Sequence, residues 1–145
     1  MITAIRNLTK KEVPITAVYF NTNYHYTVTG LFNGQIKVWR LPVSPNSQRI
    51  QTQGHILIHT YNYHSKQVDG IIKGMDERMI ISSSLDLTVC LWSLETFEML
   101  RVYNFIGEYS KIMLFDSHSA FAIKEGIIGE LVFGKFMDFI TEINS

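Results

Sequence analysis

Short runs in which apolar and polar residues alternate recur along the whole chain, with turn-forming residues about every ten positions. No segment shows a convincing 3.6-residue apolar period, so the pattern predicts an all-β protein. Segment 136–143 is apolar and is compatible with either a last strand or a short helix. The expected strands include residues 2–8, 15–20, 24–29, 35–40, 56–63, 79–82, 88–92, 97–105, 111–115, 120–124 and 130–133.

Two hairpins are predicted with particular clarity. In the first, Asn33 and Gly34 separate two alternating runs, and this dipeptide accepts left-handed backbone readily. In the second, Ser84, Leu85 and Asp86 separate two β-branched runs, the second of which ends in a tryptophan. Both hairpins are therefore expected to be antiparallel strand pairs.

The two hairpins are copies of one repeat. Three positions of the first superimpose on three positions of the second, each pair 53 residues apart: Thr29 on Ser82, Asn33 on Asp86, and Trp39 on Trp92. Residues 42–54, a polar loop with two prolines, lie between them. Without about ten residues of this loop, the spacing is near the 40–45 residues of a four-stranded propeller blade. A third, degenerate copy is expected to begin at Gly107 and Glu108 and to place Phe133 in the tryptophan position.

The second copy resembles a WD40 repeat. That family has Gly-His, a strand containing Ser or Thr, an Asp in the following turn, and Trp-Asp at the end of the next strand. The matching residues here are His64, Val68, Ser82, Asp86 and Trp92.

Each copy also departs from the family pattern. Trp-Asp is Trp39-Arg40 in the first copy and Trp92-Ser93 in the second. Tyr63 replaces the glycine before His64, and Lys11 stands where the first copy would have its histidine. The third copy keeps only size and spacing.

The resemblance implies a partial β-propeller of about three blades, each a four-stranded antiparallel sheet. The blades are expected at 13–63, 64–106 and, in degenerate form, 107–145, with 2–8 as the outer strand of a preceding blade. About thirteen strands cannot close a ring, because propellers have at least four blades. The chain is thus expected to be a fragment, a truncated product, or a part-propeller that the missing blades, another copy or another chain completes.

The resemblance further implies a structural tetrad of His64, Ser82, Asp86 and Trp92. In it Asp86 accepts a hydrogen bond from His64, the imidazole bonds Ser82, and Ser82 accepts from the indole of Trp92. A catalytic Ser-His-Asp triad is the alternative. It would need an exposed serine, an oxyanion hole and a substrate pocket, which the strand context does not suggest. We therefore expect no catalytic residue, and an enzyme or enzyme subunit is the alternative function.

Histidines at 55, 59 and 64 raise the question of a metal site. On a strand, His55 and His59 would lie about 13 Å apart, too far to share one ion with bonds near 2.1 Å. We expect neither a metal nor a cofactor. The single cysteine, Cys90, lies in a predicted strand, and one cysteine cannot form an internal disulfide framework. A chain without such a framework is typical of a reducing compartment.

Charge and hydropathy narrow the partner classes. With 46% hydrophobic residues the chain can form one compact domain, and 13 basic residues balance 13 acidic ones. No basic run is longer than Lys10 and Lys11, which disfavours nucleic acid. No signal peptide or 18-residue apolar window is present, so no membrane association is expected. We expect a soluble, intracellular and cytoplasmic protein, with a nuclear or a cytoskeletal or ciliary assembly left open.

The expected function is that of a non-catalytic scaffold that binds a protein or peptide on one face of the propeller. The resemblance implies contacts beside the tetrad positions, and the large apolar residues Phe32 and Leu85 at turn tips are the leading candidates. The alternative is that each folds back onto its own hairpin. The other candidates are Thr16, Gln67 and Asp69, with Pro14 nearby.

Overall fold

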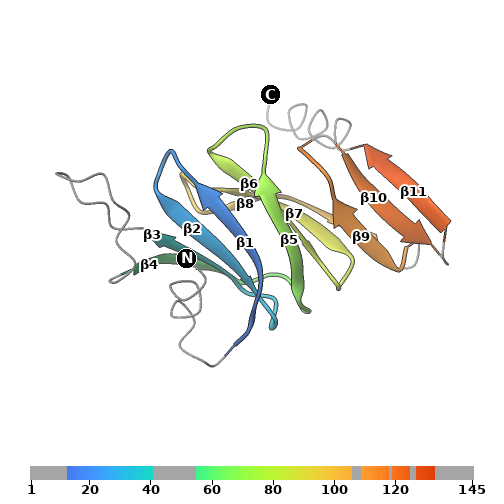
Figure 1. Ribbon diagram of the computed structural model, residues 1–145, viewed down its shortest axis with the longest axis horizontal. Helices are drawn as coiled ribbons and strands as arrows, with labels where there is room; N and C mark the ends of the chain where they lie inside the picture. The colour runs from blue at the N-terminus through green and yellow to red at the C-terminus, as the bar shows by residue number, and fades with distance from the viewer. Residues whose placement is uncertain (1–12, 41–54, 106–108, 118, 125–126, 133–145) are drawn as a thin grey trace.

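The computed structural model describes residues 13–40, 55–105, 109–117, 119–124 and 127–132, and in these ranges every regular element is a strand. Eleven strands form three antiparallel sheets, which lie in chain order across the molecule (Figure 1). The prediction of an all-β fold made of blade-like sheets is confirmed.

The first two sheets have four strands each and the same order. Sheet one runs β1, β2, β3, β4, and sheet two runs β5, β6, β7, β8. The bounds are Ile15–Asn21, Tyr26–Leu31, Ile36–Arg40 and Ile56–Tyr61 for β1 to β4, and Val68–Lys73, Met79–Ser84, Thr88–Ser93 and Met99–Asn104 for β5 to β8.

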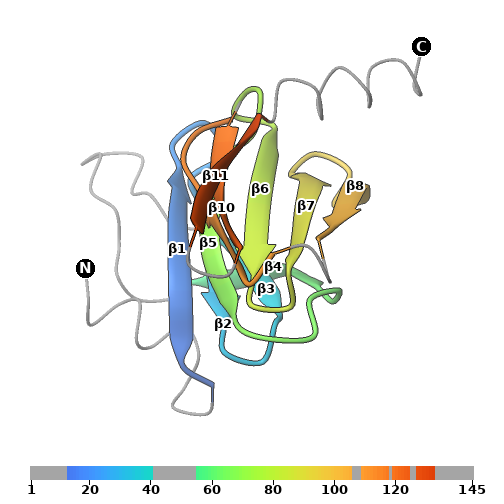
Figure 2. The same cartoon turned by 90° about the vertical axis from the view of Figure 1, so that its right-hand side faces the viewer.

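The third sheet has three described strands, in the order β9, β10, β11. Their bounds are Lys111–Leu114, Ser119–Lys124 and Ile127–Val132. The first strand of each sheet, β1, β5 or β9, lies innermost, and β5 contacts both of the others (Figures 1 and 2). The sheets are therefore arranged as neighbouring blades around a shared inner edge.

Two separate hydrophobic cores fill the spaces between the sheets. Because side chains alternate along a strand, β7 contributes Cys90 and Trp92 to the core against sheet one, and Val89 and Leu91 to the core against sheet three. All six residues of β7 are buried. Sheet two is thus packed on both faces.

Polar contacts also join the first two sheets. The phenol of Tyr61, at the end of β4, donates to the carbonyl oxygen of Ser93 at 2.6 Å, and its ring centroid lies 4.4 Å from that of Trp92. Asn21, the last residue of β1, donates its amide to the carbonyl oxygen of Glu77 at 2.6 Å. These buried contacts fix sheet one against sheet two.

Several strand boundaries differ from the sequence expectation. Strand β2 begins at Tyr26 and continues through Leu31, because Gly30 pairs with Ala17 and Ile36 instead of opening the turn. Strand β8 begins at Met99, since Phe97 has a left-handed backbone with φ of 60°. Strand β5 completes the four strands expected for the blade at 64–106, although the sequence pattern gave no bounds for it. Strand β11 begins at residue 127, earlier than expected.

Several sequence expectations concern residues outside the described ranges. They are the strand at 2–8, Lys10 and Lys11, the loop at 42–54, Gly107 and Glu108, Phe133, and the segment 136–143.

Candidate functional site

A chain of hydrogen bonds crosses sheet two from the end of β7 to the β6–β7 turn. The indole N–H of Trp92 donates to Ser82 Oγ at 2.8 Å, and Ser82 Oγ lies 2.7 Å from His64 Nε2. On the other side of the imidazole, His64 Nδ1 lies 2.7 Å from Thr88 Oγ1, and the hydroxyl of Thr88 donates to Asp86 Oδ1. All five residues are buried.

The direction of these bonds defines the state of His64. The hydroxyl of Ser82 accepts from Trp92, so its own hydrogen is available for His64 Nε2. The hydroxyl of Thr88 donates to Asp86, so it accepts from His64 Nδ1–H. One assignment therefore satisfies the whole chain, with a neutral imidazole protonated at Nδ1. Burial lowers the pKa of His64, the charge of Asp86 opposing it only in part, which favours this neutral form.

Thr88 is a member of the network that the sequence analysis missed. The expected direct bond from His64 to Asp86 is replaced by a relay through the Thr88 hydroxyl, because Asp86 Oδ2 lies 3.5 Å from His64 Nδ1. The signal in the sequence is the Asp-Leu-Thr spacing across the turn, which places a hydroxyl at the start of β7 beside the carboxylate.

Asp86 also holds the backbone around the network. Its two carboxylate oxygens accept from the backbone N–H of Ser65 at 2.8 Å and of Thr88 at 2.9 Å. Burial by itself would raise the pKa of Asp86, but the hydrogen bonds from Thr88 and Ser65 outweigh it and the pKa lies below its ordinary value. Asp86 is therefore an ionised, buried hydrogen-bond acceptor.

The serine of the network does not face a pocket that a substrate could enter. Ser82 is fully buried, and its oxygen already accepts a hydrogen bond from Trp92. A nucleophilic serine needs to face a pocket that a substrate can enter. The geometry of Ser82 and His64 provides no such access.

We expect the free energy of unfolding to fall as the pH drops below 6.5. The unfolded chain takes up a proton at His64 near the ordinary pKa of 6.5, whereas the folded chain does so only at lower pH, so the stability from neutral His64 is present above 6.5 and lost below it. Asp86, whose folded pKa lies below 3.8, adds a second loss only below that pH. Urea unfolding at a series of pH values measures this dependence.

The control for this pH series is His64→Gln, whose side chain does not titrate. Its free energy of unfolding should therefore fall less below pH 6.5 than that of the wild type. A wild-type chain whose loss over this range equals that of the variant would show that His64 is not held neutral.

Sheet one keeps only part of the same network. The indole N–H of Trp39 donates to Thr29 Oγ1 at 3.1 Å, as Trp92 does to Ser82. Asn33, in the aspartate position, is exposed and accepts from the backbone N–H of Gln35 at 3.0 Å. The first copy therefore conserves the tryptophan contact of the repeat but uses the turn residue only locally.

The two candidate contact residues at turn tips lie in equivalent, exposed positions. Phe32 is 59% exposed and Leu85 is 41% exposed. The backbone N–H of Phe32 donates to Pro14 O, and that of Leu85 to Gln67 O, both at 3.0 Å. Each turn is thus held to the segment before the innermost strand of its own sheet, and the apolar side chain projects outward.

Thr16 and Asp69 are equivalent bulge residues on the innermost strands. The register of β1 shifts around Thr16 and that of β5 around Asp69. The hydroxyl of Thr16 lies 2.6 Å from the carbonyl oxygen of Val68, which ties sheet one to sheet two. Asp69 Oδ2 is buried and has no hydrogen-bond partner among the described residues. Thr16 therefore belongs to the joint between sheets, while Asp69 keeps an unused acceptor.

The described residues contain no group of three or more His, Cys, Asp or Glu side chains arranged to hold a metal ion. This part of the chain contains no helix of the length and apolarity that crossing a membrane would take. The thiol of Cys90 is buried, which raises its pKa and makes it a poor nucleophile.

A family model from known proteins matches the first two repeats of the chain. The family model described as WD40, "WD domain, G-beta repeat", matches residues 3–40 and 55–93, more than half of the chain. Among curated proteins, the Periodic tryptophan protein 2 homolog of Neurospora crassa is 29% identical over 87 residues. The match covers 58% of this chain and 10% of that protein, so the chain spans about a tenth of the relative's length.

Two solved structures have a similar fold. The β-propeller domain of Cps50 (Swd1) from Myceliophteria thermophila has a TM-score of 0.55 at 17% identity, over 84% of this chain and 41% of that one. The C-terminal WD40 domain of Sif2 has a TM-score of 0.57 at 16% identity, over 86% of this chain and 33% of that one. With its two family-model matches and its three blade-like sheets, the chain belongs to the WD40 repeat family of β-propeller proteins.

Proposed function

We propose that this chain is a non-catalytic protein-binding module and forms part of a larger WD40 protein or assembly. The observation that supports a binding role best is the pair of exposed apolar side chains at equivalent turns, Phe32 and Leu85. Figure 2 shows the β2–β3 and β6–β7 turns toward the same, lower end of the sheets. Two such residues at the same end of neighbouring blades offer apolar contacts for a protein segment.

The outer face of the third sheet supports the proposal that further blades pack against this chain. Met113, Phe115 and Phe121 are exposed there, and the rings of Phe115 and Phe121 contact each other at 5.6 Å. Ile112 and Ala120, which alternate with them, are buried against sheet two. An apolar sheet face of this kind is stable in water when a neighbouring blade covers it.

The alternative role as an enzyme gains no support from any described residue, because the buried Ser82 and His64 are used in the network of sheet two. Cys90 as a buried free thiol supports the proposal of an intracellular, cytoplasmic location.

Replacing Phe32 and Leu85 together by alanine should abolish partner binding and leave the melting temperature within a few degrees of the wild type, since exposed side chains contribute little to folding. Affinity capture with the tagged wild-type and double-variant chains, followed by mass spectrometry and a thermal melt, provides both measurements.

The matched control is Met75→Ala, which removes another exposed apolar side chain, 53% exposed, in the β5–β6 turn at the opposite end of sheet two. It should retain the captured proteins. If the double variant retains them as well, or melts far below the wild type, Phe32 and Leu85 are not the contact residues.

A further inference from the structure

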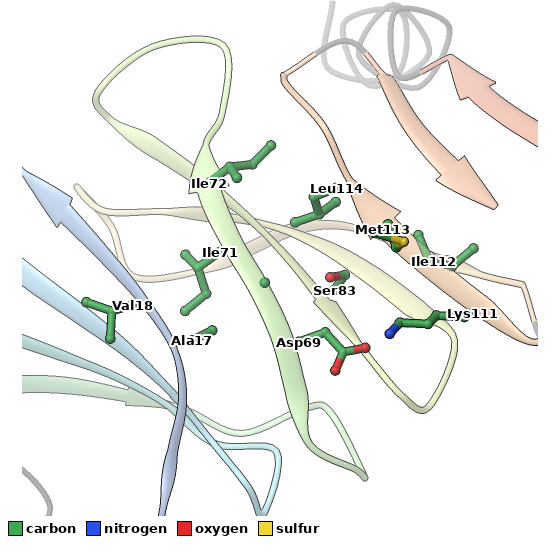
Figure 3. Close-up of a pocket in the computed structure, with 11 residues that line it drawn as sticks. Ala17, Val18, Asp69, Ile71, Ile72, Ser83, Lys111, Ile112, Met113 and Leu114 are labelled. Atoms are coloured by element: carbon green, nitrogen blue, oxygen red, sulfur yellow. The ribbon is translucent and has the colours of Figure 1, made fainter. Parts of the chain in front are cut away.

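A pocket of about 360 Å³ lies on the inner edge of the sheets, where β1, β5 and β9 meet. Its walls are mostly aliphatic, and Figure 3 shows side chains from all three strands around it. Three polar side chains reach the same pocket, those of Asp69, Ser83 and Lys111 (Figure 3). It therefore combines apolar walls with a small polar cluster, which is the usual composition of a binding site.

Two of these polar groups lack partners. Ser83 is 1% exposed, and its hydroxyl has no hydrogen-bond partner among the described residues. Asp69 Oδ2 is also buried and also has no hydrogen-bond partner among the described residues. Burial raises the pKa of Asp69, and the positive charge of Lys111 offsets this only in part. Since unpaired buried polar groups are rare and destabilising, both atoms are suited to a ligand that completes their hydrogen bonds.

The repeat provides an internal comparison for this pocket. Thr16 and Gly30, in the first copy, occupy the positions of Asp69 and Ser83 in the second. At that first joint the Thr16 hydroxyl reaches Val68 O, and a Cβ at Gly30 would lie 2.5 Å from Val68 Cγ1, so no space is left. At the second joint the same positions line a pocket with unused polar atoms. If the pocket were only the loose packing of any two neighbouring sheets, the contact between sheets one and two would contain one as well.

We propose that the pocket binds a primary carboxamide, the side chain of an asparagine or glutamine on a protein partner. This inference rests on the proposed binding function and names the group that one part of the surface recognises. The carboxamide N–H donates to Asp69 Oδ2, and its oxygen accepts from the Ser83 hydroxyl or from Lys111. The aliphatic walls, including Ile112 and Leu114, contact the methylene stem.

The donor and acceptor balance of the pocket favours a carboxamide over a cation. A lysine or arginine side chain carries no acceptor and would leave the Ser83 hydroxyl hydrogen unused. The ammonium group of Lys111 would also repel a second cation beside Asp69. A carboxylate ligand would meet the opposite difficulty, because it has no donor for Asp69. A neutral group with one donor side and one acceptor side matches the pocket.

The first test measures the stability of the 145-residue chain without a ligand. Ser83→Ala should leave the melting temperature unchanged or raise it by a few degrees, because the substitution removes an unpaired buried hydroxyl. Ser82→Ala, its neighbour on the opposite face of β6, is the matched control and should lower the melting temperature by several degrees, since it breaks the bonds to Trp92 and His64. A comparable fall for Ser83→Ala would show that its hydroxyl has a structural role and would overturn the proposal.

The second test uses N-acetyl-L-glutamine methylamide as the probe, in NMR titrations of the ¹⁵N-labelled chain. Saturable shifts should appear at the amides of Asp69, Gly70 and Ser83 and be lost in Ser83→Ala and Asp69→Ala. Asp76→Ala, which alters an exposed carboxylate in the β5–β6 turn, should bind the probe like the wild type.

Two further probes separate the ligand classes. The glutamate and arginine analogues of the same probe should bind at least tenfold more weakly than the glutamine compound. Tighter binding of the arginine analogue, or no saturable shift with the glutamine probe, would overturn the carboxamide assignment. Neither result bears on capture of partners through Phe32 and Leu85, so the outcome for this pocket is separate from that for the proposed function.

Discussion

Asp86→Ala is expected to lower the free energy of unfolding by about 2–4 kcal/mol, because it leaves several buried groups without a partner at once. The carboxylate accepts from the Thr88 hydroxyl and from the backbone N–H groups of Thr88 and Ser65. Its loss also removes the end of the chain of bonds that holds His64. Urea unfolding followed by tryptophan fluorescence measures the change, and Trp92 lies in the same network.

Asp76→Ala is the control for this experiment. Asp76 also accepts from a backbone N–H and from Arg78, but it is exposed, and its loss should change the free energy of unfolding by no more than about 0.5 kcal/mol. If Asp86→Ala melts at the wild-type temperature, the buried network does not stabilise sheet two and its assignment is wrong.

Gly34→Ala should lower the free energy of unfolding by about 2–5 kcal/mol, which combines left-handed strain with a steric clash. Gly34 has a φ of 93° in the β2–β3 turn, and a Cβ there would overlap the carbonyl oxygen of His64 and lie 2.9 Å from that of Lys66. Both obstacles are backbone atoms, so no side-chain rotation relieves them. The β2–β3 turn would have to move away from residues 64–66 of the next blade.

Gly70→Ala provides the comparison, since a Cβ at that position would meet only ordinary contacts of 3.4 Å to Ser83 Oγ and 3.5 Å to Leu114. It should change the free energy of unfolding by less than about 1 kcal/mol. Chemical denaturation of both variants gives the two values directly, and similar losses for the two would contradict the steric argument for Gly34.

The spacing of a few residues was enough to predict much of the architecture. Because Trp39 and Trp92 align at the same interval as the turn residues before them, the sequence predicts two equivalent sheets, and the structure describes two sheets of identical strand order. The alternation of side chains in 88–92 likewise predicts a strand, and the structure has β7 at Thr88–Ser93. These features depend on local periodicity, which a sequence records directly.

Other features depend on geometry that no local pattern contains. The relay through Thr88 arises because the turn places its hydroxyl between His64 and Asp86. The pocket at Asp69 and Ser83 exists only because β5 and β9 lie side by side, although they are distant in sequence. Sequence analysis selected Asp69 as a neighbour of the tetrad, but it had no means to find the partner strand.

Equivalent turns of the two copies require the same left-handed backbone, but their residues do not show it equally well. Gly34 in the first copy corresponds to Leu87 in the second, and both have a left-handed backbone, with φ of 93° and 65°. A glycine signals such a conformation in a sequence, whereas a leucine conceals it. Leu87 also packs against the core between sheets two and three, which explains how a residue disfavoured at that φ is tolerated.

The packing of β7 on both faces decides how many interfaces between sheets a single substitution destabilises. Sheets one and three each share a core with sheet two, and among the described side chains they bury no common core with each other. A substitution in either end sheet therefore weakens one of the two interfaces, whereas one in β7 weakens both. Sheet two is therefore the only neighbour that sheets one and three share in this part of the chain. Truncating a side chain in β7 should destabilise more of the structure than truncating the equivalent side chain in β3.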